Sequence, residues 1–229
     1  MEMRLALFDI DGTLLSVHGA GKRAMWKALV EAYGTAGPIE DWPFGGKTDP
    51  QLCHELLSQV GLSRDAIEEK LGPALDQYVG YLSEEMARTP LDLKPGVAEL
   101  LKALSQRSDL VLALLTGNIE EGARLKLSRH GLEAFFPFGA FGSDAAKRSD
   151  LVDIAIERAF LHSGHLFREK EIAVIGDTPL DIGCGRHKGV KAIAVATGCH
   201  PLEELILHSP DHLFADFTPF EAVIEAILR

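Results

Sequence analysis

The stretch that decides the fold is Arg4–Thr13, RLALFDIDGT, near the beginning of the chain. Its first five residues are nearly all apolar, as in a strand buried on both faces of a parallel sheet. Asp9 and Asp11 follow this run, and side chains at positions i and i+2 of an extended chain point to the same side. Gly12 permits a sharp turn. Because adjacent carboxylates repel one another, the stretch predicts a strand ending in a site that needs a cation or a shared proton.

Further along the chain, apolar runs alternate with helical patterns. The other expected strands are Leu110–Leu115, Ile172–Ile175 and Ala192–Ala196. Apolar positions at helical spacing predict helices at Val97–Leu104, Leu151–Phe160 and Phe220–Leu228. This alternation is typical of an α/β fold with a doubly wound parallel sheet, a Rossmann-like core.

One segment breaks the alternation. Between Ser16 and Arg88 we expect helices only, at Lys22–Tyr33, Pro50–Val60 and Ile67–Ala87. We therefore expect two domains, an α/β core of residues 1–15 plus 89–229 and a small all-helical cap of residues 16–88. The cap would lie over the carboxyl edge of the sheet, where ligands bind in open α/β folds. The glycines of Gly19–Ala24 resemble a loose dinucleotide fingerprint but fit the start of a helix better.

Composition limits the classes of partner. The chain has 229 residues and a formal net charge of −11, which argues against nucleic acid and anionic membranes as partners. No apolar stretch is long enough to span a bilayer, and the first residues lack a secretion cleavage site, so we expect a cytoplasmic protein. Three widely spaced cysteines predict no disulfide framework. A phosphate site in such a chain needs local positive charge.

Three more polar segments follow or adjoin the expected strands. Thr116, Gly117 and Asn118 can bind a phosphate through a hydroxyl and main-chain N–H groups, or can simply begin a helix. The adjacent Lys147 and Arg148 offer a cation, although most basic residues on a surface are only solvated.

The last segment is Gly176–Asp181, in which Asp177 ends a strand and Asp181 begins a helix. Carboxylates so placed suit Mg²⁺, which takes few protein oxygens and keeps several waters. Both acids could instead act as helix N-caps.

Taken together, the ordered motifs resemble those of the haloacid dehalogenase superfamily. Asp-x-Asp-Gly-Thr comes first, then Thr, then a basic residue, then Gly-Asp-x-x-x-Asp, and the resemblance extends over nearly the whole chain. Its nearest branch contains phosphoglycolate phosphatases and β-phosphoglucomutases, which carry a helical cap. The third motif departs from the usual Lys-Pro-x-Pro, because Ala146–Asp150 contains no proline.

The resemblance implies a role for each motif. Asp9 would be the nucleophile that becomes an aspartyl-phosphate, and Asp11 the general acid and base. Thr116 and one cation, Lys147 or Arg148, would complete catalysis; spacing to the next helix slightly favours Lys147. The expected phosphate-binding residues are Asp9, Asp11, Gly12, Thr116, Gly117 and Asn118. The expected Mg²⁺ residues are Asp9, Asp11 through its carbonyl, Asp177 and, further from the ion, Asp181.

The implied function is that of a Mg²⁺-dependent phosphatase acting on small phosphomonoesters. Asp11 favours phosphoryl transfer to and from oxygen, because dehalogenases lack an acid at that position. One alternative is a sugar phosphomutase of the β-phosphoglucomutase type, and a more distant one is a phospho-acceptor without turnover. We expect Lys47, Thr48 and Asp49 to lie on a loop that reads the non-transferred part of the substrate, with Lys47 as a mobile cation favouring a second negative group. Asp49 could instead only cap the helix expected at Pro50.

Overall fold

The computed structural model of the chain describes residues 3–229 and contains a six-stranded parallel sheet. The strands lie in the order β5-β4-β1-β6-β7-β8. Their bounds are Arg4–Phe8 (β1), Leu110–Leu115 (β4), Gly139–Ala140 (β5), Ile172–Gly176 (β6), Lys191–Val195 (β7) and His212–Phe214 (β8). The sheet confirms the predicted α/β class, and β1 lies in its middle, between β4 and β6.

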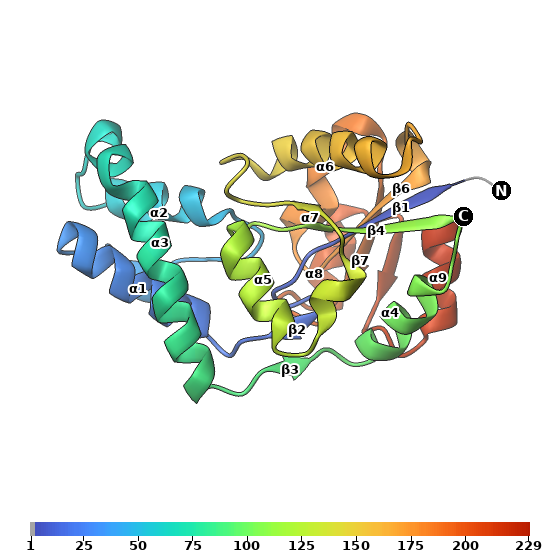
Figure 1. Cartoon of the computed structure of the whole chain (residues 1–229), viewed down its shortest axis with the longest axis horizontal. Helices are drawn as coiled ribbons and strands as arrows, with labels where there is room; N and C mark the ends of the chain where they lie inside the picture. The colour runs from blue at the N-terminus through green and yellow to red at the C-terminus, as the bar shows by residue number, and fades with distance from the viewer. Residues whose placement is uncertain (1–2) are drawn as a thin grey trace.

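Helices cover both faces of the sheet (Figure 1). They are α4 (Val97–Ser105), α5 (Glu120–Ser128), α6 (Arg148–Ser163), α7 (Pro179–Cys184), α8 (Leu202–Leu205) and α9 (Phe220–Leu228). The alternation of β1 explains the layers: Leu5 and Leu7 pack in the apolar cluster that includes α6, whereas Ala6 and Phe8 pack in the cluster that includes α4 and α9. Burial of all four side chains favours the central position of the strand.

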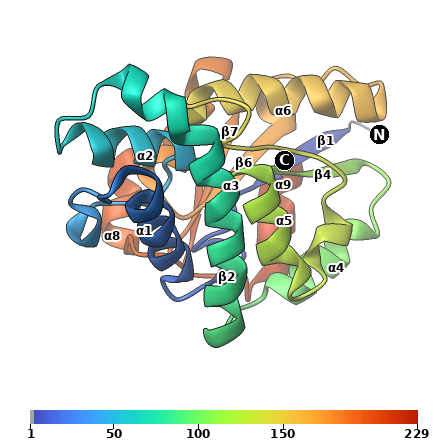
Figure 2. The same cartoon turned by 60° about the vertical axis from the view of Figure 1, so that its left-hand side comes forward.

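The helical insertion, residues 16–88, contains three long helices beside one another, on the left of Figure 1. These are α1 (Ala20–Tyr33), α2 (Asp49–Ser58) and α3 (Arg64–Arg88). A small antiparallel pair of strands, β2 (Leu15–Ser16) and β3 (Asp92–Leu93), joins the two chain segments that enter and leave the insertion. Figure 2 shows α3 beside α5, so the insertion also packs on the core.

Some bounds differ from those expected. The α6 helix begins at Arg148 rather than at Leu151, and α2 begins at Asp49 because the Thr48 hydroxyl accepts a hydrogen bond from the Gln51 N–H. The short strands β2, β3, β5 and β8 carry too few residues for a recognisable apolar pattern. Short 3₁₀ turns lie at Ile39–Asp41, Leu132–Phe135, Glu169–Glu171, Arg186–Lys188 and Ile206–His208. Within residues 3–229, every helix is too short or too polar to cross a membrane.

Candidate active site

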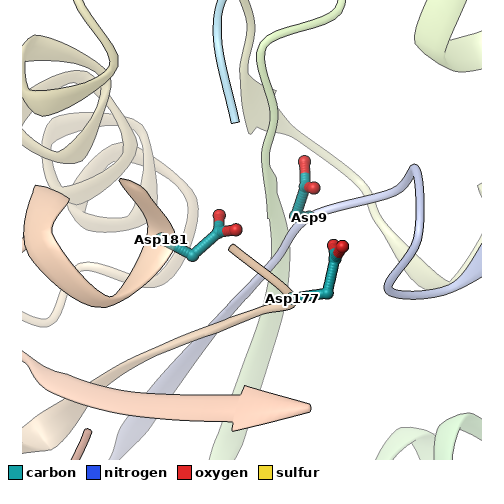
Figure 3. A group of neighbouring side chains, drawn as sticks. All are labelled: Asp9, Asp177 and Asp181. Carbon is teal, nitrogen blue, oxygen red and sulfur yellow. The ribbon is translucent and has the colours of Figure 1, made fainter. Parts of the chain in front are cut away.

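Three buried carboxylates meet at the carboxyl ends of the central strands. Asp9 follows β1, Asp177 follows β6 and Asp181 lies in α7. They offer oxygen atoms that all lie within 4.8 Å of one another, and all three residues are at least nine-tenths buried. Figure 3 shows the carboxylates gathered at one point from three separate segments. The first and last of the sequence motifs, which follow β1 and β6, therefore form one site.

Glycines make room for this cluster. Gly12 has a φ of +83°, and a Cβ atom there would collide with the Asp177 carboxylate. A Cβ atom at Gly198 would collide with the same group. The Thr13 hydroxyl donates a 2.8 Å hydrogen bond to Asp177 Oδ1, so the turn after β1 holds the carboxylate that follows β6. The requirement for close approach explains why these two positions carry no side chain.

Asp181 has two contacts of different kinds. Its Oδ2 atom accepts hydrogen bonds of 3.0 Å from the Thr178 N–H and 2.6 Å from the Thr178 hydroxyl, which forms a capping box at the start of α7. Its Oδ1 atom pairs with Arg148. Asp181 therefore takes part in helix capping, as the alternative interpretation of this motif held. Asp177 differs, since it accepts from Thr13 instead.

The electrostatics of the cluster call for a cation. Burial, with the charges of neighbouring carboxylates, raises the pKa of Asp9 to about 6 and that of Asp177 to about 8, although Arg148 lowers both. A bound divalent cation would relieve this cost, because it favours the ionised form of each carboxylate. A set of buried carboxylate oxygens is also the donor set that Mg²⁺ prefers. These residues therefore fit a magnesium ion.

Arg148 is the basic residue of the third motif that reaches the site. Its guanidinium is 5% exposed, and Nη2 lies 3.1 Å from Asp9 Oδ1 while also contacting Asp181. Lys147 is exposed and precedes the first turn of α6. The expectation that spacing favours Lys147 does not fit this geometry, because α6 begins at Arg148, earlier than the expected Leu151. Arg148 Nε is buried without a hydrogen-bond partner within residues 3–229.

Asp11 belongs to a polar network beside the carboxylate cluster. Its Oδ2 atom accepts a hydrogen bond of 2.8 Å from Asn118 Nδ2 and one of 2.6 Å from Lys126 Nζ. Lys126 also donates to Asn118 Oδ1 at 2.6 Å, and Asn118 donates to Thr116 Oγ1 at 2.8 Å. The network places Thr116 and Asn118 beside Asp11. Sequence reasoning missed Lys126, which sits between two leucines on α5 and carries no motif.

The loop before α2 closes over this edge of the core. The Thr48 hydroxyl donates a 2.7 Å hydrogen bond to the Ala146 carbonyl, and the Asp49 N–H donates a 2.8 Å hydrogen bond to the Gly117 carbonyl. Asp49 Oδ2 accepts 2.9 Å from the Ile119 N–H at the start of α5. Asp49 therefore caps a helix of the core and not α2, which corrects the alternative considered for it.

Lys47 lies on the same loop but is not a mobile cation. Its ammonium pairs with Glu55, and it lies 5.3 Å from the centre of the Trp42 ring. Because Glu55 offsets its charge, the expectation of a free cation is wrong, although Lys47 does line the cavity described next.

A single cavity of about 320 Å³ joins these groups. Asp9, Asp11, Thr116 and Arg148 line it from the core, and residues of α1, α3 and the loop before α2 line it from the helical insertion. Its volume is at the small end of the range for ligand pockets. The site thus combines a carboxylate cluster, a buried guanidinium and a partly open space for a small molecule.

Comparisons with known proteins agree with this geometry. The sequence model of the family described as "Haloacid dehalogenase-like hydrolase" matches residues 6–195. The chain is 30% identical over 239 residues to a phosphoglycolate phosphatase of Synechococcus elongatus, covering 99% of this chain and 100% of the relative. It is 26% identical over 227 residues to the probable phosphatase IndB of Dickeya dadantii, covering 98% and 95%.

A solved structure shares the fold. The crystal structure of a predicted phosphatase from Clostridium acetobutylicum superposes with a TM-score of 0.73 at 17% identity, covering 98% of this chain and 100% of that one. The family match spans most of the chain and includes the strands that carry Asp9, Thr116 and Asp177. The chain therefore belongs to the haloacid dehalogenase-like hydrolases and is an enzyme of that family.

Proposed function

We propose that the protein is a Mg²⁺-dependent phosphatase that hydrolyses small phosphomonoesters through an aspartyl-phosphate on Asp9. The observation that carries this proposal is the position of Asp9 in the cavity, with its carboxylate 3.1 Å from a buried guanidinium and among three converging carboxylates. A nucleophile placed beside fixed positive charge suits attack on an anionic phosphorus centre. The phosphatases among the relatives support the same reaction class.

In the first half-reaction an Asp9 oxygen attacks phosphorus and the bond from phosphorus to the leaving oxygen breaks. Asp11 gives its proton to that oxygen, so the product leaves as an alcohol. Arg148 and the Thr116 hydroxyl hold the phosphoryl oxygens, together with main-chain N–H groups near Gly12, Gly117 and Asn118. Orientation and fixed charge supply most of the catalysis in such a transfer.

In the second half-reaction water attacks phosphorus and the bond to Asp9 breaks, which frees inorganic phosphate. Asp11 accepts the proton of the attacking water and so returns to its starting state. Asp9, Asp177 and the Asp11 carbonyl would hold Mg²⁺, with Asp181 further out, and the ion would offset negative charge on the phosphoryl group. Covalent catalysis thus divides one difficult displacement into two easier ones.

We propose that residues 16–88 act as a cap domain over this site. The loop containing Lys47, Thr48 and Asp49 contacts the core beside Gly117 and Ala146, and the cavity lies between the two parts. A site partly covered by the insertion limits the access of bulk water to the phosphoenzyme and selects small leaving groups. The substrate class that fits is a small phosphorylated metabolite, similar to a phosphoglycolate or a sugar phosphate.

The test is a steady-state screen of purified protein on a panel of phosphomonoesters with Mg²⁺. We expect release of inorganic phosphate over many turnovers. In reactions quenched with acid, labelled phosphate should remain bound to the protein as an aspartyl-phosphate on Asp9. Phosphate that moves within the sugar and is not released would instead indicate a phosphomutase. A single turnover that leaves a stable phosphoprotein would indicate a phospho-acceptor and would contradict the proposal.

A further inference from the structure

Tyr78 on α3 presents an unpartnered hydroxyl to the cavity. The residue is 2% exposed and lines the cavity, yet its hydroxyl makes no hydrogen bond to any residue in the range 3–229. Because this hydroxyl has no partner in the described part of the chain, it is available to donate to or accept from a polar group of a ligand in the cavity. Two other tyrosines of the insertion are paired, Tyr33 with the Ile67 carbonyl at 2.6 Å and Tyr81 with Glu31.

Asp49 also presents an unused atom to the cavity. Its Oδ2 accepts from the Ile119 N–H, whereas Oδ1 has no hydrogen-bond partner in the described part of the chain. Asp49 and Tyr78 are close enough for the carboxylate charge to help raise the pKa of Tyr78, after the larger effect of burial. Both residues line the cavity and no hydrogen bond joins them, so a polar group of a ligand bound there can contact either one.

Lys126 contributes a spare donor to the same place. Its ammonium is 3% exposed and carries three protons, of which two go to Asp11 and Asn118. Gly21 on α1 lies opposite: a Cβ atom there would be 3.5 Å from the Tyr78 hydroxyl oxygen and 3.8 Å from Lys126 Nζ. The absence of a side chain at Gly21 therefore leaves open the space next to both groups.

We propose that Tyr78, Asp49 and Lys126 form a subsite that binds hydroxyl groups on the leaving part of the substrate. This inference rests on the proposed phosphatase function and narrows its substrate class to polyol or sugar monophosphates. A hydroxyl donates one hydrogen bond and accepts others, so it can donate to Asp49 Oδ1 while accepting from Tyr78 or Lys126. The subsite shares the cavity with Asp9, so a short leaving group can reach it.

A carboxylate on the leaving group fits this subsite less well. Lys126 is already paired with Asp11, and the charge of Lys47 is offset by Glu55. At pH 7.5 Asp49 is mostly ionised, since burial raises its pKa only to about 6. A substrate carboxylate would therefore lie beside a negative charge that Lys126 and the Ile119 N–H only partly offset, which is unfavourable.

The experiment compares kcat/KM for three esters at pH 7.5 with Mg²⁺: glycerol 3-phosphate, propyl phosphate, which lacks its hydroxyls, and phosphoglycolate. We expect the wild type to prefer glycerol 3-phosphate over propyl phosphate by about 10-fold or more, since a site built for a hydroxyl rejects an analogue without it. Tyr78→Phe should reduce that preference at least about 3-fold. The matched control Tyr81→Phe removes a hydroxyl from the same helix outside the cavity and should keep the preference.

Gly21→Ala provides a second, independent variant. The added methyl group makes only ordinary contacts with Tyr78 and Lys126, and alanine favours helices, so we expect an unchanged or higher Tm. The methyl group nevertheless fills the space for the hydroxyl, so the preference for glycerol 3-phosphate should fall. If Gly21 had only a structural role, its replacement would not lower the preference for glycerol 3-phosphate while leaving Tm unchanged or higher.

The outcomes distinguish the two proposals. Equal kcat/KM for glycerol 3-phosphate and propyl phosphate overturns the subsite and leaves the phosphatase function standing. A preference that survives both Tyr78→Phe and Gly21→Ala, or a higher kcat/KM for phosphoglycolate than for glycerol 3-phosphate, also overturns the subsite. No phosphate release from any of the three esters or from the wider panel overturns both proposals.

Discussion

At the scale of single residues, Arg148 connects the stability of the fold with its chemistry. Its guanidinium is buried between Asp9 and Asp181 and also donates a 3.0 Å hydrogen bond to the Leu115 carbonyl of β4. A buried charge without its partner is costly, so removal of one member of this group affects the others. The same guanidinium stands where a phosphoryl group would bind.

Arg148→Ala should therefore lower kcat by about 100-fold or more and destabilise the protein by about 3 kcal/mol, because two buried carboxylates lose their cation. The neighbouring Lys147→Ala provides the matched control and should change kcat less than about threefold, since Lys147 is exposed. Phosphate release and urea unfolding check the two effects. A larger loss in the Lys147 variant than in the Arg148 variant would refute this assignment of the cation.

Asp9→Asn should abolish turnover while keeping the fold. An amide is a very poor nucleophile, and loss of a covalent nucleophile costs several orders of magnitude in kcat. The measurement is phosphate release, with circular dichroism as the check on folding. Asp76→Asn, on the exposed side of α3, is the control and should keep wild-type activity. Residual activity within tenfold of wild type, with contamination excluded, would rule out Asp9 as the nucleophile.

Sequence could predict some of these residues and not others. Asp9 and Asp177 were predictable because each directly follows an apolar strand, and parallel strands bring their carboxyl ends together. The choice between Lys147 and Arg148 depends on the residue at which α6 begins, and the apolar pattern does not fix that boundary. Lys126 and Tyr78 were out of reach, because their contacts arise only when α3 packs beside α5.

At the scale of elements, the start of α5 depends on a residue from the insertion. Asp49 accepts from the Ile119 N–H, which is an otherwise unused donor at this helix end. Burial raises the pKa of Asp49 to about 6. Because the folded state holds this proton more tightly than the unfolded state, the contribution of Asp49 to stability is full below about pH 4 and is lost as pH rises through 6.

Asp49→Asn should remove this pH dependence and keep an acceptor for Ile119. Between about pH 4 and pH 6 the Tm of the wild type should fall relative to that of the variant, and the difference in unfolding free energy should reach at most about 3 kcal/mol. Thermal unfolding across this range is the measurement. A constant difference at all pH values would show that Asp49 does not titrate in this way.

The main elements of the fold were predictable for physical reasons. The strands β1 and β4 match the expected bounds, because a strand buried on both faces has a continuous apolar run. Very short strands such as β5 are held by their neighbours in the sheet and leave no pattern of their own. The division into core and cap at residues 16–88 stays a prediction.

At the scale of the whole molecule, Mg²⁺ should couple activity to stability. Removal of divalent ions with a chelator should abolish phosphate release, and added Mg²⁺ should restore it, whereas Ca²⁺ should inhibit because it does not reproduce octahedral geometry. Mg²⁺ should also raise Tm, since an ion that binds only the folded state stabilises it by mass action. Full activity after exhaustive chelation, confirmed by elemental analysis, would contradict the proposed metal requirement.

The contact between the loop before α2 and the core has a consequence for protein engineering. A Cβ atom at Gly117 would collide with the Lys47 carbonyl, and one at Gly142 would collide with the Gly117 carbonyl, so three stretches of main chain stack without side chains between them. The main-chain part of this joint does not depend on side-chain identity, whereas the Thr48 and Asp49 side chains add specific hydrogen bonds to Ala146 and Ile119. Chimeras that carry the insertion of one relative on the core of another should assemble wherever the core keeps these two glycines and the insertion keeps Thr48 and Asp49, and a larger residue at either glycine should make the exchange fail.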